Sequence, residues 1–175
     1  MSERLRSGLA WTIATAGGAG CLRPMPGTWG SIWAAVIALA IVFWTPSSAW
    51  GAVFCALTLL SSFAGWWACP WAIRHYGRSD PSQVVIDEVA GLWLALALLA
   101  LVLPSLMQTA AIGTIVIAFL WFRLFDVWKP WPISRLERLP GATGIMADDL
   151  AAGLAAALFT AFSLVAWMQW IPGAE

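Results

Sequence analysis

Long stretches without a charged residue dominate this chain, and short stretches between them hold almost all of its charges. The longest uncharged run covers 50 residues, from Pro24 to Ile73. A membrane crossing needs about 20 apolar residues, so this run is too long for one helix and suits two. A turn at Thr45-Pro46-Ser47-Ser48 divides it. We therefore predict membrane-spanning helices near Trp29–Trp44 and Trp50–Ile73.

A second uncharged run covers 34 residues, from Val89 to Phe122, and is divided at Pro104-Ser105. Each half is short for a crossing, so both helices are expected to extend into their charged flanks. This extension draws four charged residues into the helix ends: Asp87, Glu88, Arg123 and Asp126.

The two ends of the chain complete the expected architecture. A last span is predicted from about Leu150 to Ile171. The stretch from Leu9 to Leu22 contains Gly17, Gly18 and Gly20, so we expect a short interfacial or re-entrant helix there. The predicted fold is all-α: a polytopic membrane bundle of about five transmembrane helices plus this short N-terminal helix, in a single domain covering residues 1–175.

Composition agrees with this architecture. The chain is 61% hydrophobic and 10% charged, which is typical of an integral membrane protein. Its formal net charge is zero, so there is no basic surface of the kind that binds nucleic acid. Three cysteines without metal-ligand spacing imply neither a disulfide framework nor a zinc site.

The positive charges give the orientation. All nine Lys and Arg residues fall in the loops on one side of the predicted spans, and the positive-inside rule makes that side cytoplasmic. Many of the 14 tryptophans flank the spans, as an aromatic belt would, whereas Trp93 lies inside a span and is expected to pack in the bundle.

Five of the nine acidic residues lie in three places beside the apolar runs. Ionisable groups next to hydrocarbon are costly and usually functional. All three places fall at the predicted cytoplasmic edge, where clustered carboxylates would form a site for a hard cation such as Mg²⁺. The candidate metal ligands are Asp87, Glu88, Asp126, Asp148 and Asp149.

A weak internal repeat suggests which acids face inward. Asp87 is followed by Ala90-Gly91-Leu92, and Asp149 by Ala152-Gly153-Leu154, at the same offsets. A glycine four residues on shares the face of the aspartate and lets another helix approach closely. Asp87 and Asp149 are thus expected to point into the bundle. For one acid of each adjacent pair, a role as a helix N-cap is about as plausible as a ligand role.

Phosphate-holding groups accompany the acids. The turn-rich stretch from Pro24 to Ser31 offers the backbone of Gly27 and the hydroxyls of Thr28 and Ser31 at a helix start, where anions bind. Arg123 and Lys129 supply cations on the same side, and Arg123 shares a helix face with Asp126, three residues on. Positive-inside flanking is the competing explanation for these cations.

Other phosphatase chemistries are excluded by what the chain lacks. His75 is its single histidine, so a pair of catalytic histidines is ruled out. Cys69 has no arginine at the spacing of a cysteine phosphatase loop, and Lys129, the single lysine, follows no Gly-rich phosphate loop. Metal-assisted hydrolysis remains.

Four motifs together resemble the phosphatidylglycerophosphatase A family over roughly Gly17 to Phe159. They are Pro26-Gly27-Thr28-Trp29-Gly30-Ser31; Val85-Ile86-Asp87-Glu88; Phe122-Arg123-Leu124-Phe125-Asp126 with Lys129-Pro130-Trp131-Pro132-Ile133; and Gly144-Ile145-Met146-Ala147-Asp148-Asp149. One departure is Ala142, where the family often has the second of two glycines.

The resemblance implies a Mg²⁺-dependent enzyme of the bacterial inner membrane that converts phosphatidylglycerol phosphate to phosphatidylglycerol and phosphate. It implies catalytic roles for Asp87, Asp126, Asp149 and Arg123. Attack by water and an aspartyl-phosphate intermediate both stay open. The alternatives are a cation or phosphate transporter, whose site would lie nearer the membrane midplane, and a non-catalytic scaffold.

Overall fold

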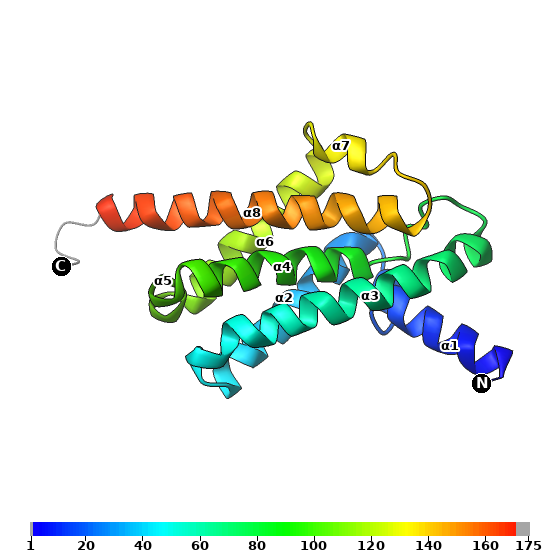
Figure 1. The fold of residues 1–175 in the computed structure, drawn as a ribbon, viewed down its shortest axis with the longest axis horizontal. Helices are drawn as coiled ribbons and strands as arrows, with labels where there is room; N and C mark the ends of the chain where they lie inside the picture. Colours follow the sequence, from blue (N-terminus) through cyan, green and yellow to red (C-terminus); the bar gives the residue numbers. More distant parts are fainter. Residues whose placement is uncertain (1, 171–175) are drawn as a thin grey trace.

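The computed structural model describes residues 2–170, and within that range it is helical, with no β-strand (Figure 1). The longer helices run along the long axis of the molecule. In chain order the elements are α1 (Glu3–Ala14), η1 (Ala19–Cys21), α2 (Pro26–Trp44), η2 (Ser47–Ala49), α3 (Trp50–Tyr76), α4 (Ile86–Val102), α5 (Pro104–Thr109), α6 (Ala111–Trp128), α7 (Ile133–Leu136) and α8 (Ala142–Trp170).

Four stretches of the described chain are long and apolar enough to cross a membrane: Pro26–Trp44, Ser47–Tyr76, Ala111–Trp128 and Ala142–Gln169. The fifth predicted span, α4, has 17 residues and is therefore about 25 Å long, a little less than the hydrocarbon thickness of about 30 Å. Large apolar side chains such as Phe43, Phe63 and Phe162 are exposed on the outside, as lipid contact requires. The all-α membrane bundle is confirmed.

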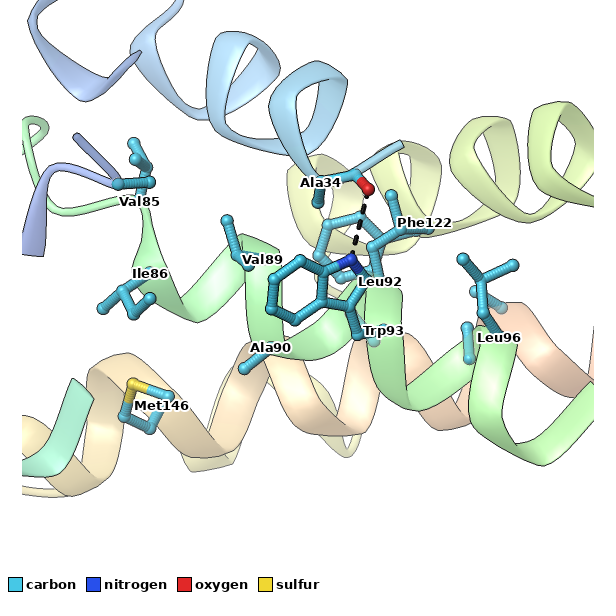
Figure 2. Close-up of a cluster of buried hydrophobic side chains, with 14 of the residues drawn as sticks. Ala34, Val85, Ile86, Val89, Ala90, Leu92, Trp93, Leu96, Phe122 and Met146 are labelled. Carbon is cyan, nitrogen blue, oxygen red and sulfur yellow. Dashed lines mark hydrogen bonds between the residues drawn. The ribbon is translucent and has the colours of Figure 1, made fainter. Parts of the chain in front are cut away.

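Helix α4 is the centre of the bundle, because it packs against α2, α3, α6 and α8. Beyond the acidic pair in its first turn, its side chains are apolar all round, as expected of a helix surrounded by others. Trp93 is buried in this core and its indole N–H donates to the carbonyl oxygen of Ala34 at 3.1 Å (Figure 2). The predicted packing role of Trp93 is confirmed.

Several boundaries differ from the sequence prediction. The N-terminal helix starts and ends earlier than the predicted Leu9–Leu22, because positive φ angles at Ala16, Gly17 and Gly18 break the chain after Ala14. Trp50, one of the tryptophans that flank the predicted spans, is buried, and its indole N–H donates to the carbonyl of Thr45. The predicted end of the last span, Ile171, lies outside the described residues.

Helix α8 starts eight residues before the predicted Leu150, because Ala142 to Ala147 continue the helix beyond the acidic pair. Asp148 and Asp149 therefore lie past its first turn, and the prediction that they sit at a helix N-terminus is wrong. Asp87 and Glu88 do lie in the first turn of α4, where the helix dipole favours carboxylates. The N-cap of α4 is Val85, so neither acid has the alternative role of N-cap.

Candidate active site

A cavity of about 670 Å³ lies where the starts of α2, α4 and α8 meet the end of α6 and the loop after α7. The four motifs singled out in the sequence therefore meet at one end of the bundle. Its charged lining residues are Asp80, Asp87, Glu88, Arg123, Asp126, Lys129, Glu137, Arg138, Asp148 and Asp149.

Three carboxylates converge at the inner wall of this cavity. Asp87, Glu88 and Asp149 each place one oxygen within 4.8 Å of the others. Asp87 and Asp149 are 7% and 3% exposed. Oδ1 of Asp87 and Oε2 of Glu88 are buried and have no hydrogen-bond partner among the described residues. Buried carboxylate oxygens without donors are strongly unfavourable unless a cation neutralises them.

Close backbone contacts bring these carboxylates together. A Cβ on Gly153 would overlap the carbonyl oxygen of Gly91, so α4 and α8 touch there. A Cβ on Gly27 would overlap the carboxylate of Glu88, and one on Gly30 would lie 2.6 Å from Cβ of Val85. The close approach predicted from the repeated Ala-Gly-Leu is confirmed. The glycines of α2 make room for α4 rather than for an open anion site.

The start of α4 is held in place by a second contact. The backbone N–H of Val85 donates to the carbonyl oxygen of Ala14, the last residue of α1, at 2.8 Å. The N-terminal helix therefore fixes Val85, two residues before Asp87, and α1 supports the site although it contributes no residue to the cavity wall.

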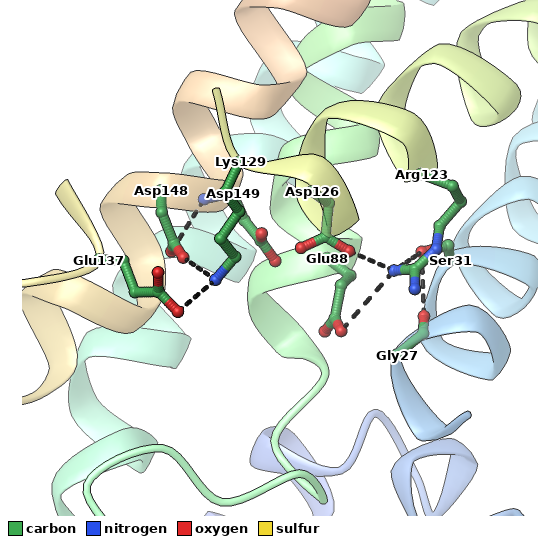
Figure 3. A network of polar contacts seen from close by, with 9 residues as sticks. All are labelled: Gly27, Ser31, Glu88, Arg123, Asp126, Lys129, Glu137, Asp148 and Asp149. Carbon is green, nitrogen blue, oxygen red and sulfur yellow. Dashed lines mark hydrogen bonds and ion pairs between the residues drawn. The ribbon is translucent and has the colours of Figure 1, made fainter. Parts of the chain in front are cut away.

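Arg123 forms one side of the site (Figure 3). Its Nη1 pairs with Oδ2 of Asp126 and lies 4.0 Å from Oε1 of Glu88. The same nitrogen donates to Oγ of Ser31 at 3.4 Å, and that hydroxyl donates to the carbonyl of Gly27 at 3.0 Å. The guanidinium is thus oriented from three sides. The prediction that Arg123 and Asp126 share a helix face is confirmed, and their ion pair is an additional finding.

Lys129 forms the other side. Its Nζ donates to Oδ2 of Asp148 at 2.6 Å and to Oε1 of Glu137 at 2.9 Å (Figure 3). Burial disfavours the ammonium, but the hydrogen bonds to Asp148 and Glu137 outweigh it and raise the pKa of Lys129 above its ordinary value. Lys129 is therefore a permanent cation at neutral pH. Its backbone is left-handed, with φ of 45°, an unusual conformation for a residue with a side chain.

The predicted residues fall into distinct groups. The cavity wall includes Gly27, Arg123 and Lys129, whereas Thr28 and Ser31 do not line it. Of the five predicted metal ligands, three converge, Asp126 is engaged by Arg123 and Asp148 by Lys129. Which of these five would bind a metal directly remains a prediction.

Sequence reasoning missed Glu137, Arg138 and Asp80. Glu137 and Arg138 stand in a charged stretch that a positive-inside loop explains without any site. Asp80 lies in a polar loop between two spans. A signal was available for Glu137, the one acidic residue between Lys129 and the acidic pair of α8.

The geometry suits a phosphate group next to a bound cation. Two cations, Arg123 and Lys129, flank a group of buried carboxylates in which Oδ1 of Asp87 and Oε2 of Glu88 have no hydrogen-bond partner among the described residues. A phosphate would be repelled by the carboxylates alone and attracted by the two cations. Fold and site together define an integral membrane protein with a polar, acid-lined cavity at one end of its helix bundle.

Comparison with known proteins identifies the family. The profile of the family described as phosphatidylglycerophosphatase A matches residues 12–164. The chain belongs to the phosphatidylglycerophosphatase A family, whose named members are phosphatases acting on phosphate monoesters, and it is therefore an enzyme of that class.

Three relatives cover most of the chain. A Bacteroides thetaiotaomicron protein, provisionally named a phosphatidylinositol-3-phosphatase, is 35% identical over 92% of this chain and 94% of its own length. Phosphatidylglycerophosphatase A of Haemophilus influenzae is 32% identical, covering 89% of this chain and 88% of the relative. The Escherichia coli enzyme of the same name is 32% identical, covering 89% and 84%. No solved structure matches the chain.

Proposed function

We propose that this protein removes the terminal phosphate of phosphatidylglycerol phosphate within a bacterial inner membrane, releasing phosphatidylglycerol and inorganic phosphate. The observation that carries the proposal is the cavity in which Arg123 and Lys129 flank three buried carboxylates. The two relatives named phosphatidylglycerophosphatase A supply the substrate. The transporter alternative is not favoured, because no relative here is named a transporter.

A divalent cation such as Mg²⁺ fits the carboxylate group. Asp87, Glu88 and Asp149 offer oxygen ligands only, which is the donor set that Mg²⁺ prefers. The partnerless oxygens of Asp87 and Glu88 are the independent sign that a cation belongs there. When bound, Mg²⁺ would lower the negative charge on the phosphate and the pKa of a bound water.

The side chains of the chain itself bind and orient the substrate. Arg123 has N–H groups besides Nη1, and these are free to form a bidentate contact with phosphate oxygens. Asp126 holds the guanidinium in the required direction. Lys129, placed by Asp148 and Glu137, presents a point charge from the opposite side.

The carboxylate group either supplies the nucleophile itself or accepts the proton of an attacking water. An aspartate oxygen of this group can attack phosphorus itself and form an aspartyl-phosphate. Alternatively, an oxygen such as Oδ1 of Asp87 accepts a proton from the attacking water. In both routes the lipid glycerol oxygen leaves from the far side of phosphorus.

The test measures phosphate release by the purified protein from phosphatidylglycerol phosphate, with Mg²⁺ and with excess chelator. Phosphatidylinositol 3-phosphate is run in parallel, because it is the substrate in the name of the Bacteroides relative. Asp87→Asn and Asp149→Asn should abolish most activity, whereas Glu3→Gln, a change remote from the cavity, should not. Faster phosphate release from the inositol lipid would overturn the proposed substrate. Full activity in chelator would overturn the proposed metal requirement.

A further inference from the structure

A second, smaller cavity adjoins the candidate active site. It has a volume of about 250 Å³ and shares Pro26 and Ser82 with the larger cavity. Arg23, Tyr76 and Gln83 complete its polar wall. This volume is below the roughly 300–1,000 Å³ of sites for drug-sized ligands, so the cavity suits one small group of a larger molecule.

The charge of this cavity is opposite to that of its neighbour. Among the residues that the structure describes, no Asp or Glu lines it, and Arg23 is its only Lys or Arg. Arg23 forms no ion pair within residues 2–170, whereas Arg123 and Lys129 in the larger cavity are both engaged by carboxylates. Arg138 of the larger cavity also forms no ion pair within these residues, but it shares that cavity wall with seven carboxylates. The small cavity is therefore the place beside the site where a further anion gains a free cation without facing an acid.

Two features indicate that this anion belongs to a lipid. Leu22 and Met25, on either side of Arg23 in the chain, are 48% and 61% exposed, so apolar surface surrounds the cation. Arginine beside exposed apolar side chains is the arrangement that binds a headgroup at a membrane surface. The buried Oε1 of Gln83 has no hydrogen-bond partner among the described residues, and this acceptor suits the free hydroxyl of the headgroup glycerol rather than a phosphate oxygen.

We propose that the Arg23 cavity binds the phosphodiester of the lipid substrate while its terminal phosphomonoester occupies the larger cavity. This inference rests on the proposed function and deepens it. The two phosphates of phosphatidylglycerol phosphate are joined by one glycerol, and the two cavities adjoin at their shared residues Pro26 and Ser82. The subsite would favour a lipid with both a phosphodiester and a phosphomonoester over phosphatidic acid, which has the monoester alone.

A binding experiment tests the subsite without catalysis. Short-chain phosphatidylglycerol, which has a phosphodiester and no monoester, is titrated into the full-length protein in detergent and chelator. Arg23→Gln should weaken binding about tenfold, as expected for loss of one charge-assisted hydrogen bond. Arg78→Gln, an exposed arginine outside both cavities, should bind like the wild type. Equal affinity of Arg23→Gln and the wild type would overturn the subsite.

A hydrolysis experiment decides whether the bound phosphodiester belongs to the substrate or to another lipid. The kcat/KM values for phosphatidylglycerol phosphate and for phosphatidic acid are measured with Mg²⁺ in the wild type, Arg23→Gln and Arg78→Gln. Arg23→Gln should lower the first about tenfold and leave the second unchanged, and Arg23→Lys should restore part of the loss. An unchanged ratio of the two values, despite weakened phosphatidylglycerol binding, would assign the cavity to a bystander lipid and overturn the proposal.

The two experiments also separate this inference from the function on which it rests. If the wild type releases no phosphate from phosphatidylglycerol phosphate, the proposed function fails. If phosphatidylglycerol binding then still depends on Arg23, the phosphodiester site stands. If Arg23→Gln instead lost equal activity on both substrates, Arg23 would contact the reacting phosphate or support the fold. That result would contradict the subsite.

Discussion

Gly153 of α8 lies directly against Gly91 of α4, and a Cβ at position 153 would overlap the carbonyl oxygen of Gly91. A Cβ on Gly91 would in turn lie 2.5 Å from the carbonyl oxygen of Asp149. The atoms in the way are backbone, which cannot rotate aside as a side chain can. These two glycines therefore set the separation of the helices that bring Asp87 and Asp149 together.

Gly153→Ala should accordingly separate α4 from α8 and lower both stability and activity. Overpacking of this kind costs about 1–3 kcal/mol. Gly113→Ala in α6 is the matched control, because a Cβ there meets nothing within 4 Å and alanine favours the helix. Thermal unfolding in one detergent, together with phosphate release, measures both effects. A Gly153→Ala protein as stable and active as Gly113→Ala would contradict the assigned contact.

Asp148 and Lys129 should behave as one unit. Their side chains are 2.6 Å apart, so Asp148→Asn and Lys129→Met each break the same contact. We expect the double variant to be about as active as the worse single variant, with a coupling energy of about 0.5–3 kcal/mol from kcat/KM values. Additive losses would show that Asp148 acts separately from Lys129, for instance as a direct metal ligand.

The raised pKa of Lys129 gives that pair a defined pH dependence. Because the folded pKa exceeds the unfolded value of about 10.4, the stabilisation is complete below that pH and is lost only as the pH rises through the folded value. Wild type and Lys129→Met should therefore differ in stability by a constant amount between pH 6 and pH 9. A difference that changes across this range in thermal unfolding would contradict the assignment.

Arg123→Lys should lose far more activity than Lys129→Arg. Nη1 of Arg123 alone contacts Asp126 and Ser31, and a lysine ammonium cannot keep these contacts and also offer a fork to phosphate. The loss of a charge-assisted hydrogen bond, about 1.5–3 kcal/mol, corresponds to about 10–100-fold in kcat/KM. Arginine at position 129 can still reach both of its carboxylates. The reverse order of activities would require exchanging the two roles.

The orientation is tested by cysteine labelling in intact cells. Cys21 is exposed and is first replaced by serine. Cysteines at positions 78 and 135 should resist an impermeant reagent until the cells are opened, whereas one at position 46, between α2 and α3, should react at once. Labelling of position 135 in intact cells would place the candidate site on the opposite face of the membrane.

Much of this fold can be read from where charges are missing. The uncharged runs, interrupted at Pro46 and Pro104, locate the long helices along the chain because hydrocarbon tolerates few ionised groups. The start of α8 was misplaced, because a search for uncharged residues stops at Asp148 and Asp149 although the helix continues past them. Charge patterns locate the membrane better than they locate helix ends.

The sequence predicts which residues belong to the site better than it predicts which of them contact one another. The repeated Ala-Gly-Leu identified Asp87 and Asp149 as inward-facing, because helical spacing is a local property. The contact of Lys129 with Glu137 and Asp148 depends on the path of the chain around α7, which no local spacing encodes. Glu137 was missed for that reason.

The convergence of Asp87, Glu88 and Asp149 has a consequence for the synthesis of the chain. Asp87 and Glu88 belong to α4, whereas Asp149 belongs to α8, which is synthesised later than α4. Until α8 inserts, the newly made chain has neither its third converging carboxylate nor the glycine that closes α8 against α4. The activity can therefore arise only after α8 has inserted and packed against α4, and its onset would report that contact.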